Sequence, residues 1–437
     1  MSEVAAVAPR YSDGRSEWRA WAMLVILGLL WMVSFVDRFI LALLVAPLKA
    51  DLHLNDVQLG LLFGTFFAVF YALMGIPLAR LADNHNRKRL IIAGVVFWSL
   101  CTIGSAFATN YATLALLRIG LATGEAALTP AAFSLLTDAF PPRRRMIAGT
   151  LLSAMGMMGA SIAFIAGAGV IAWAEQAQAS MGMSAWRLAL MIVGMPGIAL
   201  TVAFAFIARE PSRSELEAKV SMGDVFRFLR KERALYGGLF AGAGAAQLIS
   251  YALIAWSAAH LSRSFGLASA EAGSWLGLSQ FVSAVGGTII VPFVIRIVAA
   301  RNITVASLLP ATGVIAAGIL VVLSTISGNA HSFLILSTMG AFLLVGITNA
   351  ILVLIQSTVP GSMRATVTSL LLICVSGIGL GLGPALVPML GRIFPQAYGE
   401  LSAGLMGVAF VGCAIGTGAF FVAARSLRRE FARLEER

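Results

Sequence analysis

The sequence predicts an all-α membrane protein in which twelve transmembrane helices form two six-helix bundles. Of the 437 residues, 59% are hydrophobic and only 12% are charged, whereas soluble domains carry about 25% charged residues. Apolar runs that reach the roughly 20 residues needed to span a bilayer recur along the whole chain. We place the spans at 21–46, 59–81, 90–108, 111–135, 146–174, 187–208, 235–260, 272–297, 303–326, 331–358, 364–391 and 401–424.

The basic residues predict which side of the membrane each loop faces. Cytoplasmic loops carry an excess of Lys and Arg, and most of the 31 in this chain fall in segments that the alternating spans place beside the two termini. The opposite side receives Lys49, Arg187, Arg263 and Arg392. We therefore expect a multi-pass protein of the plasma membrane, in bacteria the inner membrane, with both termini in the cytoplasm.

The longest polar stretch falls between the sixth and seventh spans and divides the chain into two halves of six spans, which is typical of parallel internal repeats. Within it, Val225, Phe226 and Leu229 are spaced as one helical face, which is typical of an interfacial helix; a mobile linker is the alternative. The expected organisation is a cytoplasmic tail, a bundle, a cytoplasmic linker, a second bundle and a basic cytoplasmic tail, at 1–20, 21–208, 209–234, 235–424 and 425–437.

Several classes of partner and cofactor lack support in the sequence. The net charge of +11 comes from short loops, so it reports topology and predicts no nucleic-acid partner. Cys101, Cys374 and Cys413 each lie in an apolar run without ligand spacing, and the four histidines are scattered, so we expect no metal. No nucleotide-binding loop or soluble catalytic domain is found, so we expect neither a cofactor nor an enzyme.

Four charged residues lie where the chain should be in lipid. Asp37 and Arg38 fall in the first span, and Arg118 and Glu125 in the fourth. An ionised group near the bilayer centre costs at least roughly 2.5–3.5 kcal/mol, and such residues by default indicate a proton relay or an ion or substrate path. The alternative is a charge cluster that only holds the bundle together.

Helix geometry predicts how these four residues meet. With a rise of about 1.5 Å per residue, Asp37 and Arg118 lie roughly 12 Å and 10 Å below the outer surface, so we expect an ion pair between them. Glu125 lies nearly two turns further on the same face, so Arg118 could serve either carboxylate in turn and couple protonation to conformation. Arg38 points about 100° away from Asp37 and is left free for an anionic substrate.

Polar residues in the spans of the second half could complete a substrate cavity with Arg38 and Arg118. For each of them an interhelical hydrogen bond is the alternative. They are Gln247, Tyr251, Asn349 and Gln356.

The loop after the second span resembles the signature loop of the major facilitator superfamily, with Asp83, Arg87 and Lys88 at its charged positions. The run from Arg118 through Gly120 and Gly124 to Glu125 resembles a second signature of that family. Together with Val36-Asp37-Arg38-Phe39 and Asn86-Arg87-Lys88, these residues look like the Spinster-type transporters, which include sphingosine-1-phosphate and lysophospholipid exporters. The informative matches are confined to residues 35–145.

The resemblance implies the major facilitator fold and assigns roles to these residues. Asp37 and Glu125 would be the proton-linked carboxylates, Arg118 their switchable partner and Arg38 an anion contact. Asp83 and Arg87 would gate the cytoplasmic side, where Asp83 could meet the start of the eleventh span; a salt bridge within the loop is the alternative.

The expected function is therefore proton-coupled secondary transport by alternating access. The substrate would be a small molecule or lipid, most simply an amphipathic or anionic lipid-like solute, moved by a monomer among membrane lipids with the proton gradient as its energy source. A drug or organic-acid exporter of the same family and an uncoupled lipid scramblase are the alternatives.

Overall fold

A computed structural model describes residues 14–211, 221–393 and 398–435. Parts of the predicted tail and linker, residues 1–13 and 212–220, lie outside the described residues. Within the described residues, twelve helical segments are long and apolar enough to cross a membrane. The predicted number and order of spans are therefore confirmed, and most helices extend a few residues beyond the predicted limits.

The first half of the chain supplies six of these segments, two of which are composite. The second span joins two α-helical pieces through a π-helical turn, and the fourth is broken at Ala126 and Ala127. The elements are α1 (Gly14–Leu43), α2 (Val45–Leu52), α3 (Asp56–Gly60), η1 (Leu61–Thr65), α4 (Phe66–Asn84), α5 (Arg87–Ser105), α6 (Tyr111–Glu125), α7 (Leu128–Ala139), α8 (Pro142–Met181) and α9 (Ala185–Ile207).

The second half repeats the pattern after a short linker helix. Its second span is again interrupted by a π-helical turn. The elements are α10 (Met222–Lys231), α11 (Arg233–Phe265), α12 (Ser269–Phe281), η2 (Val282–Gly286), α13 (Gly287–Arg301), α14 (Ile303–Thr325), α15 (Ala330–Thr358), α16 (Gly361–Gly391) and α17 (Glu400–Glu435).

Asparagine caps fix where several helices begin. The side chains of Asn86, Asn110, Asn302 and Asn329 each accept a hydrogen bond from the backbone N–H three residues later. Such a cap satisfies one of the amide donors that the first helical turn leaves free. The caps of α5 and α14 occupy the same place in the two halves.

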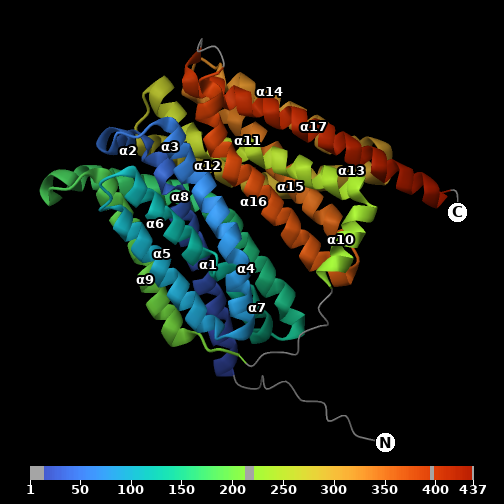
Figure 1. Cartoon of the computed structure of the whole chain (residues 1–437), viewed down its shortest axis with the longest axis horizontal. Coiled ribbons are helices and arrows are strands. Elements are labelled where there is room, and N and C mark those ends of the chain that lie inside the picture. The colour runs from blue at the N-terminus through green and yellow to red at the C-terminus, as the bar shows by residue number, and fades with distance from the viewer. Residues whose placement is uncertain (1–13, 212–220, 394–397, 436–437) are drawn as a thin grey trace, which may run out of the picture.

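The two halves lie side by side in Figure 1, the first in blue to green and the second in yellow to red. We call the side with the connections at residues 84–87, 140–142, 208–211 and 359–361 the basic side, and the side with residues 44–56, 106–110, 182–184 and 262–268 the far side.

Close contacts join the halves between their middle and the far side. A Cβ atom on Gly64 would lie 2.1 Å from the Leu380 carbonyl oxygen, so only glycine lets η1 approach α16 so closely. Ser161 of α8 donates to the Gly277 carbonyl oxygen of α12 at 2.7 Å, and Thr65 donates to Gly381 at 2.6 Å.

Helix α10 differs in part from the predicted interfacial helix. Val225 is fully buried, and Phe228 and Leu229 pack against the core, whereas Phe226 is 57% exposed. The buried face therefore holds Phe228 in place of Phe226. The Phe228 ring lies 5.2 Å from that of Tyr236 on α11, so this face docks onto the protein.

The end of the chain is also more helical than the predicted tail suggests. Helix α17 runs without a break to Glu435, and the residues after 424 extend the last span beyond its apolar part. Basic side chains do not prevent a helix from continuing, since Arg and Lys are good helix formers.

Candidate functional site

The four charged residues of the predicted site meet where α1 faces α6. Asp37, Arg118 and Glu125 are 0–2% exposed, and the Arg38 side chain is 11% exposed. Glycines draw the supporting helices together: a Cβ atom on Gly124 would lie 2.8 Å from the carbonyl oxygen of Gly94 on α5. Close packing of α5 and α6 therefore buries Glu125 at the end of α6.

Arg118 bonds the backbone of α1 and not the carboxylate that was predicted. Its Nη1 donates to the Asp37 carbonyl oxygen at 2.8 Å and its Nη2 to the Arg38 carbonyl oxygen at 2.9 Å. The predicted similar depth did bring these residues together. The predicted ion pair between Asp37 and Arg118 was wrong because a carbonyl oxygen has a second lone pair, which can accept from the guanidinium.

Arg38, predicted to be free, forms the ion pair of the site. Its Nη2 lies 2.7 Å from Oε2 of Glu125. The 100° step that separates Arg38 from Asp37 along the helix turns it toward the deeper carboxylate of α6. The guanidinium also lies 4.3 Å from the ring centroid of Phe67 and 5.0 Å from that of Phe35, so aromatic faces cover the rest of the charge.

Asp37 is the least supported charge of the cluster. Neither of its carboxylate oxygens has a hydrogen-bond partner among the described residues. Thr102 and Trp98 of α5 lie beside it with side chains that can donate to a carboxylate, although among the described residues the Trp98 indole N–H has no partner in ideal geometry. Burying a charged carboxylate without hydrogen bonds is costly. Of the four charged groups, Asp37 is therefore the one whose burial a bound proton would make less costly.

One of the predicted residues of the second half faces this cluster. Tyr251 of α11 lies within electrostatic reach of Arg38, and its ring centroid is 6.5 Å from that of Phe39 on α1. Gln247 lies one turn earlier on α11, against Gly379 of α16. Arg38 therefore has Glu125 of its own half on one side and Tyr251 of the other half nearby.

The other two predicted residues are placed elsewhere. The Asn349 amide donates to Thr288 of α13 at 3.1 Å and to the Val345 carbonyl oxygen at 2.9 Å, which uses both of its donors within the second half. Gln356 is exposed near the end of α15. Neither forms a hydrogen bond with the cluster in the described ranges.

The predicted gating residues take different positions on the basic side. Asp83 at the end of α4 is exposed, and the described contacts include no ion pair with it. The alternative, a salt bridge within the loop from Asp83 to Arg87 or Arg89, is not formed among the described residues either. Arg87 is turned instead toward Asp138 and Glu210. Arg364 near the start of α16 is also exposed, so the expected meeting of Asp83 with that helix is absent from this conformation.

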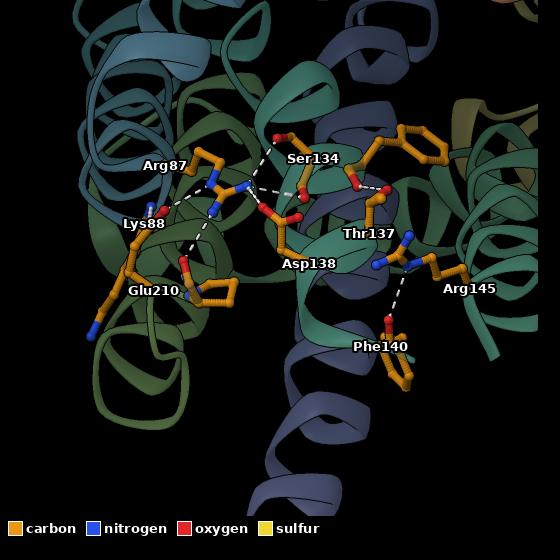
Figure 2. Close-up of polar contacts among 10 residues, drawn as sticks. Arg87, Lys88, Ser134, Thr137, Asp138, Phe140, Arg145 and Glu210 are labelled. Atoms are coloured by element: carbon orange, nitrogen blue, oxygen red, sulfur yellow. Dashed lines mark hydrogen bonds and ion pairs between the residues drawn. The ribbon is translucent and has the colours of Figure 1, made fainter. Parts of the chain in front are cut away.

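Arg87 is 1% exposed and ties three parts of the first half together, as Figure 2 shows. It donates to Asp138 and to Ser134 of α7, and its Nε lies 2.7 Å from Glu210 after α9. The backbone N–H of Lys88 adds a bond to the same Glu210 carboxylate at 2.9 Å. These contacts lie within one half, as expected of a structural tie.

An ion pair that the sequence analysis missed joins the halves on the far side. Arg263 at the end of α11 donates to both carboxylate oxygens of Asp56 at 2.7 and 2.9 Å. Lys49 adds a third bond to Asp56 at 2.9 Å. The available signal was the scarcity of basic residues on this side, since Lys49 and Arg263 are two of the few that lie there.

Comparisons with known proteins agree with this architecture. The family model of the Major Facilitator Superfamily matches residues 27–384. An MFS-type efflux pump of Mycolicibacterium smegmatis is 32% identical over 66% of this chain and 65% of its own length. Protein spinster homolog 1 of Xenopus tropicalis is 30% identical over 45% of this chain and 36% of its own. The chain thus matches less than two thirds of the length of these curated relatives.

Solved structures show the same fold over nearly the whole chain. A crystal structure of a bacterial homologue of the human lysosomal transporter Spinster, in an inward-facing and unoccupied conformation, gives a TM-score of 0.85 at 26% identity. That match covers 94% of this chain and 98% of the other. The same homologue in its inward-facing and occupied conformation gives a TM-score of 0.81.

Proposed function

We propose that this chain, which belongs to the Major Facilitator Superfamily and is of the Spinster type, is a proton-coupled secondary transporter that works by alternating access. As a member of this family it is a transporter and not an enzyme. The observation that carries the coupling is the buried cluster in which Arg38 pairs with Glu125 while the Asp37 carboxyl accepts no hydrogen bond from the described residues.

In the proposed cycle, Glu125 and Asp37 each bind and release protons as the site opens first to one side of the membrane and then to the other. Protonation of Glu125 removes the charge that holds Arg38 within the first half. Arg38 then faces Tyr251 and the second half with an uncompensated charge, which an anionic solute can neutralise. Arg118, which bonds two backbone carbonyls, keeps α1 in register with α6 throughout.

The conformation described here corresponds in this proposal to the inward-facing state. The Asp56–Arg263 pair closes the far side, whereas Asp83 and Arg364 are exposed on the basic side. If the basic side is cytoplasmic, as the positive-inside rule predicts, the site opens to the cytoplasm. Opening the far side would break the Asp56 pair, and closing the basic side would bring Asp83 toward α16.

The proposed substrate is an amphipathic or anionic lipid-like solute. The cluster offers a guanidinium surrounded by aromatic rings. The ring centroids of Phe67, Tyr71 and Phe35 all lie within 5.6 Å of the guanidinium carbon of Arg38. A cation set in an apolar wall suits a ligand with an anionic headgroup and an apolar chain. The similarity to an efflux pump supports the second candidate, a drug or organic-acid exporter.

The test is transport by the purified protein in liposomes, with an imposed pH gradient and labelled lysophospholipids or small organic anions as substrates. The proposal expects accumulation that follows the pH gradient and is lost when a protonophore collapses it. Lipid movement that is the same with and without the gradient would identify an uncoupled scramblase and contradict the proposal.

A further inference from the structure

An apolar cavity lies inside the second half, away from the cluster around Arg38. Its volume is about 120 Å³, and it lies where the ends of α13, α15 and α17 meet the starts of α11 and α14 on the basic side. Its floor is buried, with Leu235, Ile351 and Phe420 at 1–3% exposure. A water needs only about 10–15 Å³ but also polar partners, so this cavity suits an apolar group.

Comparison of the two halves explains why no side chain fills the cavity. Asn86 caps α5 and Asn302 caps α14 in the same way, so Arg87 and Ile303 follow equivalent caps. In the first half the guanidinium of Arg87 fills the space beside α7 and bonds Asp138 there. In the second half Ile303 lines the cavity instead, and no charged network occupies the place among the described residues.

Two arginines stand at the mouth of the cavity. Leu427 lines it, and the next residue, Arg428, donates through Nε to Ser307, another lining residue, at 3.1 Å. Arg301 is exposed two residues before Ile303. No carboxylate pairs with either arginine among the side chains that the structure describes.

The cavity mouth adjoins a lipid-facing surface. Val305 on α14 and Phe421 and Val422 on α17 are 44–48% exposed, and they follow or precede lining residues directly. In a membrane such apolar side chains face acyl chains. An apolar slot that opens sideways to lipid, below unpaired arginines at the membrane surface, is the arrangement that recognises an anionic lipid headgroup and its chain.

We propose that this cavity binds one acyl chain of an anionic phospholipid from the leaflet on the basic side, with the phosphate held by Arg301 and Arg428. The charge of the arginines selects an anionic headgroup, and the apolar floor receives the chain. The site is separate from the transport cluster, because its lining lies wholly in the second half. Its occupant would fill the space that Arg87 fills in the first half.

The test compares phosphatidylglycerol with phosphatidylcholine of the same acyl chains, added to the purified full chain and counted by native mass spectrometry. Wild type should bind phosphatidylglycerol more tightly. Arginines near a membrane surface contribute about 1 kcal/mol each, so Arg301→Gln with Arg428→Gln should weaken phosphatidylglycerol by about 30-fold. Ala306→Phe, which places a ring in the cavity, should weaken binding of both lipids.

Matched controls separate the site from general attraction to the basic side. Arg89→Gln with Arg143→Gln removes two exposed arginines of the first half, and Ala300→Phe adds a ring at an exposed position beside the cavity; all should bind as wild type does. Equal binding of the two lipids to wild type, or equal losses in the site and control variants, would overturn the proposal. The charge variant leaves the buried apolar floor of the cavity unchanged, so it decides the matter even if Ala306→Phe fails to fold.

Discussion

The guanidinium of Arg38 and the carboxylate of Glu125 lie 2.7 Å apart and join α1 to α6 inside the first half of the molecule. The Glu125 side chain is 2% exposed and Arg38 11%, so water screens the pair little. Each partner still has an atom without a hydrogen bond to any described residue, Oε1 of Glu125 and Nε of Arg38. This incomplete bonding distinguishes the pair from the fully bonded Arg87 tie and suits an interaction that is broken in each cycle.

Arg118 should be required for both stability and transport. Arg118→Ala removes two charge-assisted hydrogen bonds to α1 and should lower the free energy of unfolding by about 3 kcal/mol. Arg118→Lys keeps the charge but lacks the two guanidinium nitrogens that donate to the two carbonyl oxygens. It should therefore recover only part of the lost free energy of unfolding. Chemical unfolding in detergent and transport in liposomes measure the two effects, and a lysine variant equal to wild type would contradict this role.

The Asp56–Arg263 pair should hold the far side closed. Arg263→Gln leaves Asp56 with only Lys49. A partly exposed bidentate pair contributes on the order of 1 kcal/mol, so the ratio of far-side-open to far-side-closed molecules should rise about fivefold. Spin labels at positions 50 and 268, exposed on the two halves, report the distance. Glu271→Gln, an exposed carboxylate change on the same side, serves as the control and should leave the distance distribution unchanged.

Asp83→Asn should act on the opposite conformation. Asp83 is exposed and forms no ion pair with any described residue in this conformation, so its loss should leave this state intact and weaken closure of the basic side. The population with the basic side open should increase. A pair of labels at positions 81 and 362, near the ends of α4 and α16, measures this change; an unaltered distribution would remove Asp83 from the gate.

The Arg87 network should contribute to the stability of the folded protein more than to gating. Removing one partner of a buried charge pair typically costs about 3–5 kcal/mol, so Arg87→Gln should destabilise the protein by that order. Thermal unfolding of the purified protein checks it, with Arg89→Gln as the exposed neighbour. A fully stable Arg87→Gln variant that fails to transport would instead restore the predicted gating role.

Much of the fold could be predicted because membrane insertion depends on local composition. Span number and order follow from apolar runs, and the depth of Asp37 and Arg118 follows from helical rise, so their meeting was predictable. What the sequence could not supply is rotation about each helix axis and the choice among acceptors. These decide that Arg118 bonds carbonyl oxygens and that Arg38 reaches Glu125.

Contacts between the halves were the other feature that could not be predicted from the sequence. Asp56 and Arg263 are far apart in sequence and each reads as an ordinary loop charge, so their pairing depends on the conformation that the whole molecule adopts. Polar residues in spans were equally ambiguous: Tyr251 faces the cluster, whereas Asn349 satisfies its amide inside its own half.

The most direct test of proton coupling is the ratio of outward-facing to inward-facing molecules as a function of pH, measured by the spin-label distance at positions 50 and 268 in wild type and in Glu125→Gln. The account predicts that wild type changes its ratio with pH, because protonation of Glu125 releases Arg38, and that the glutamine variant loses this change and keeps at most the part that Asp37 contributes. The same pH dependence in both proteins would contradict the account.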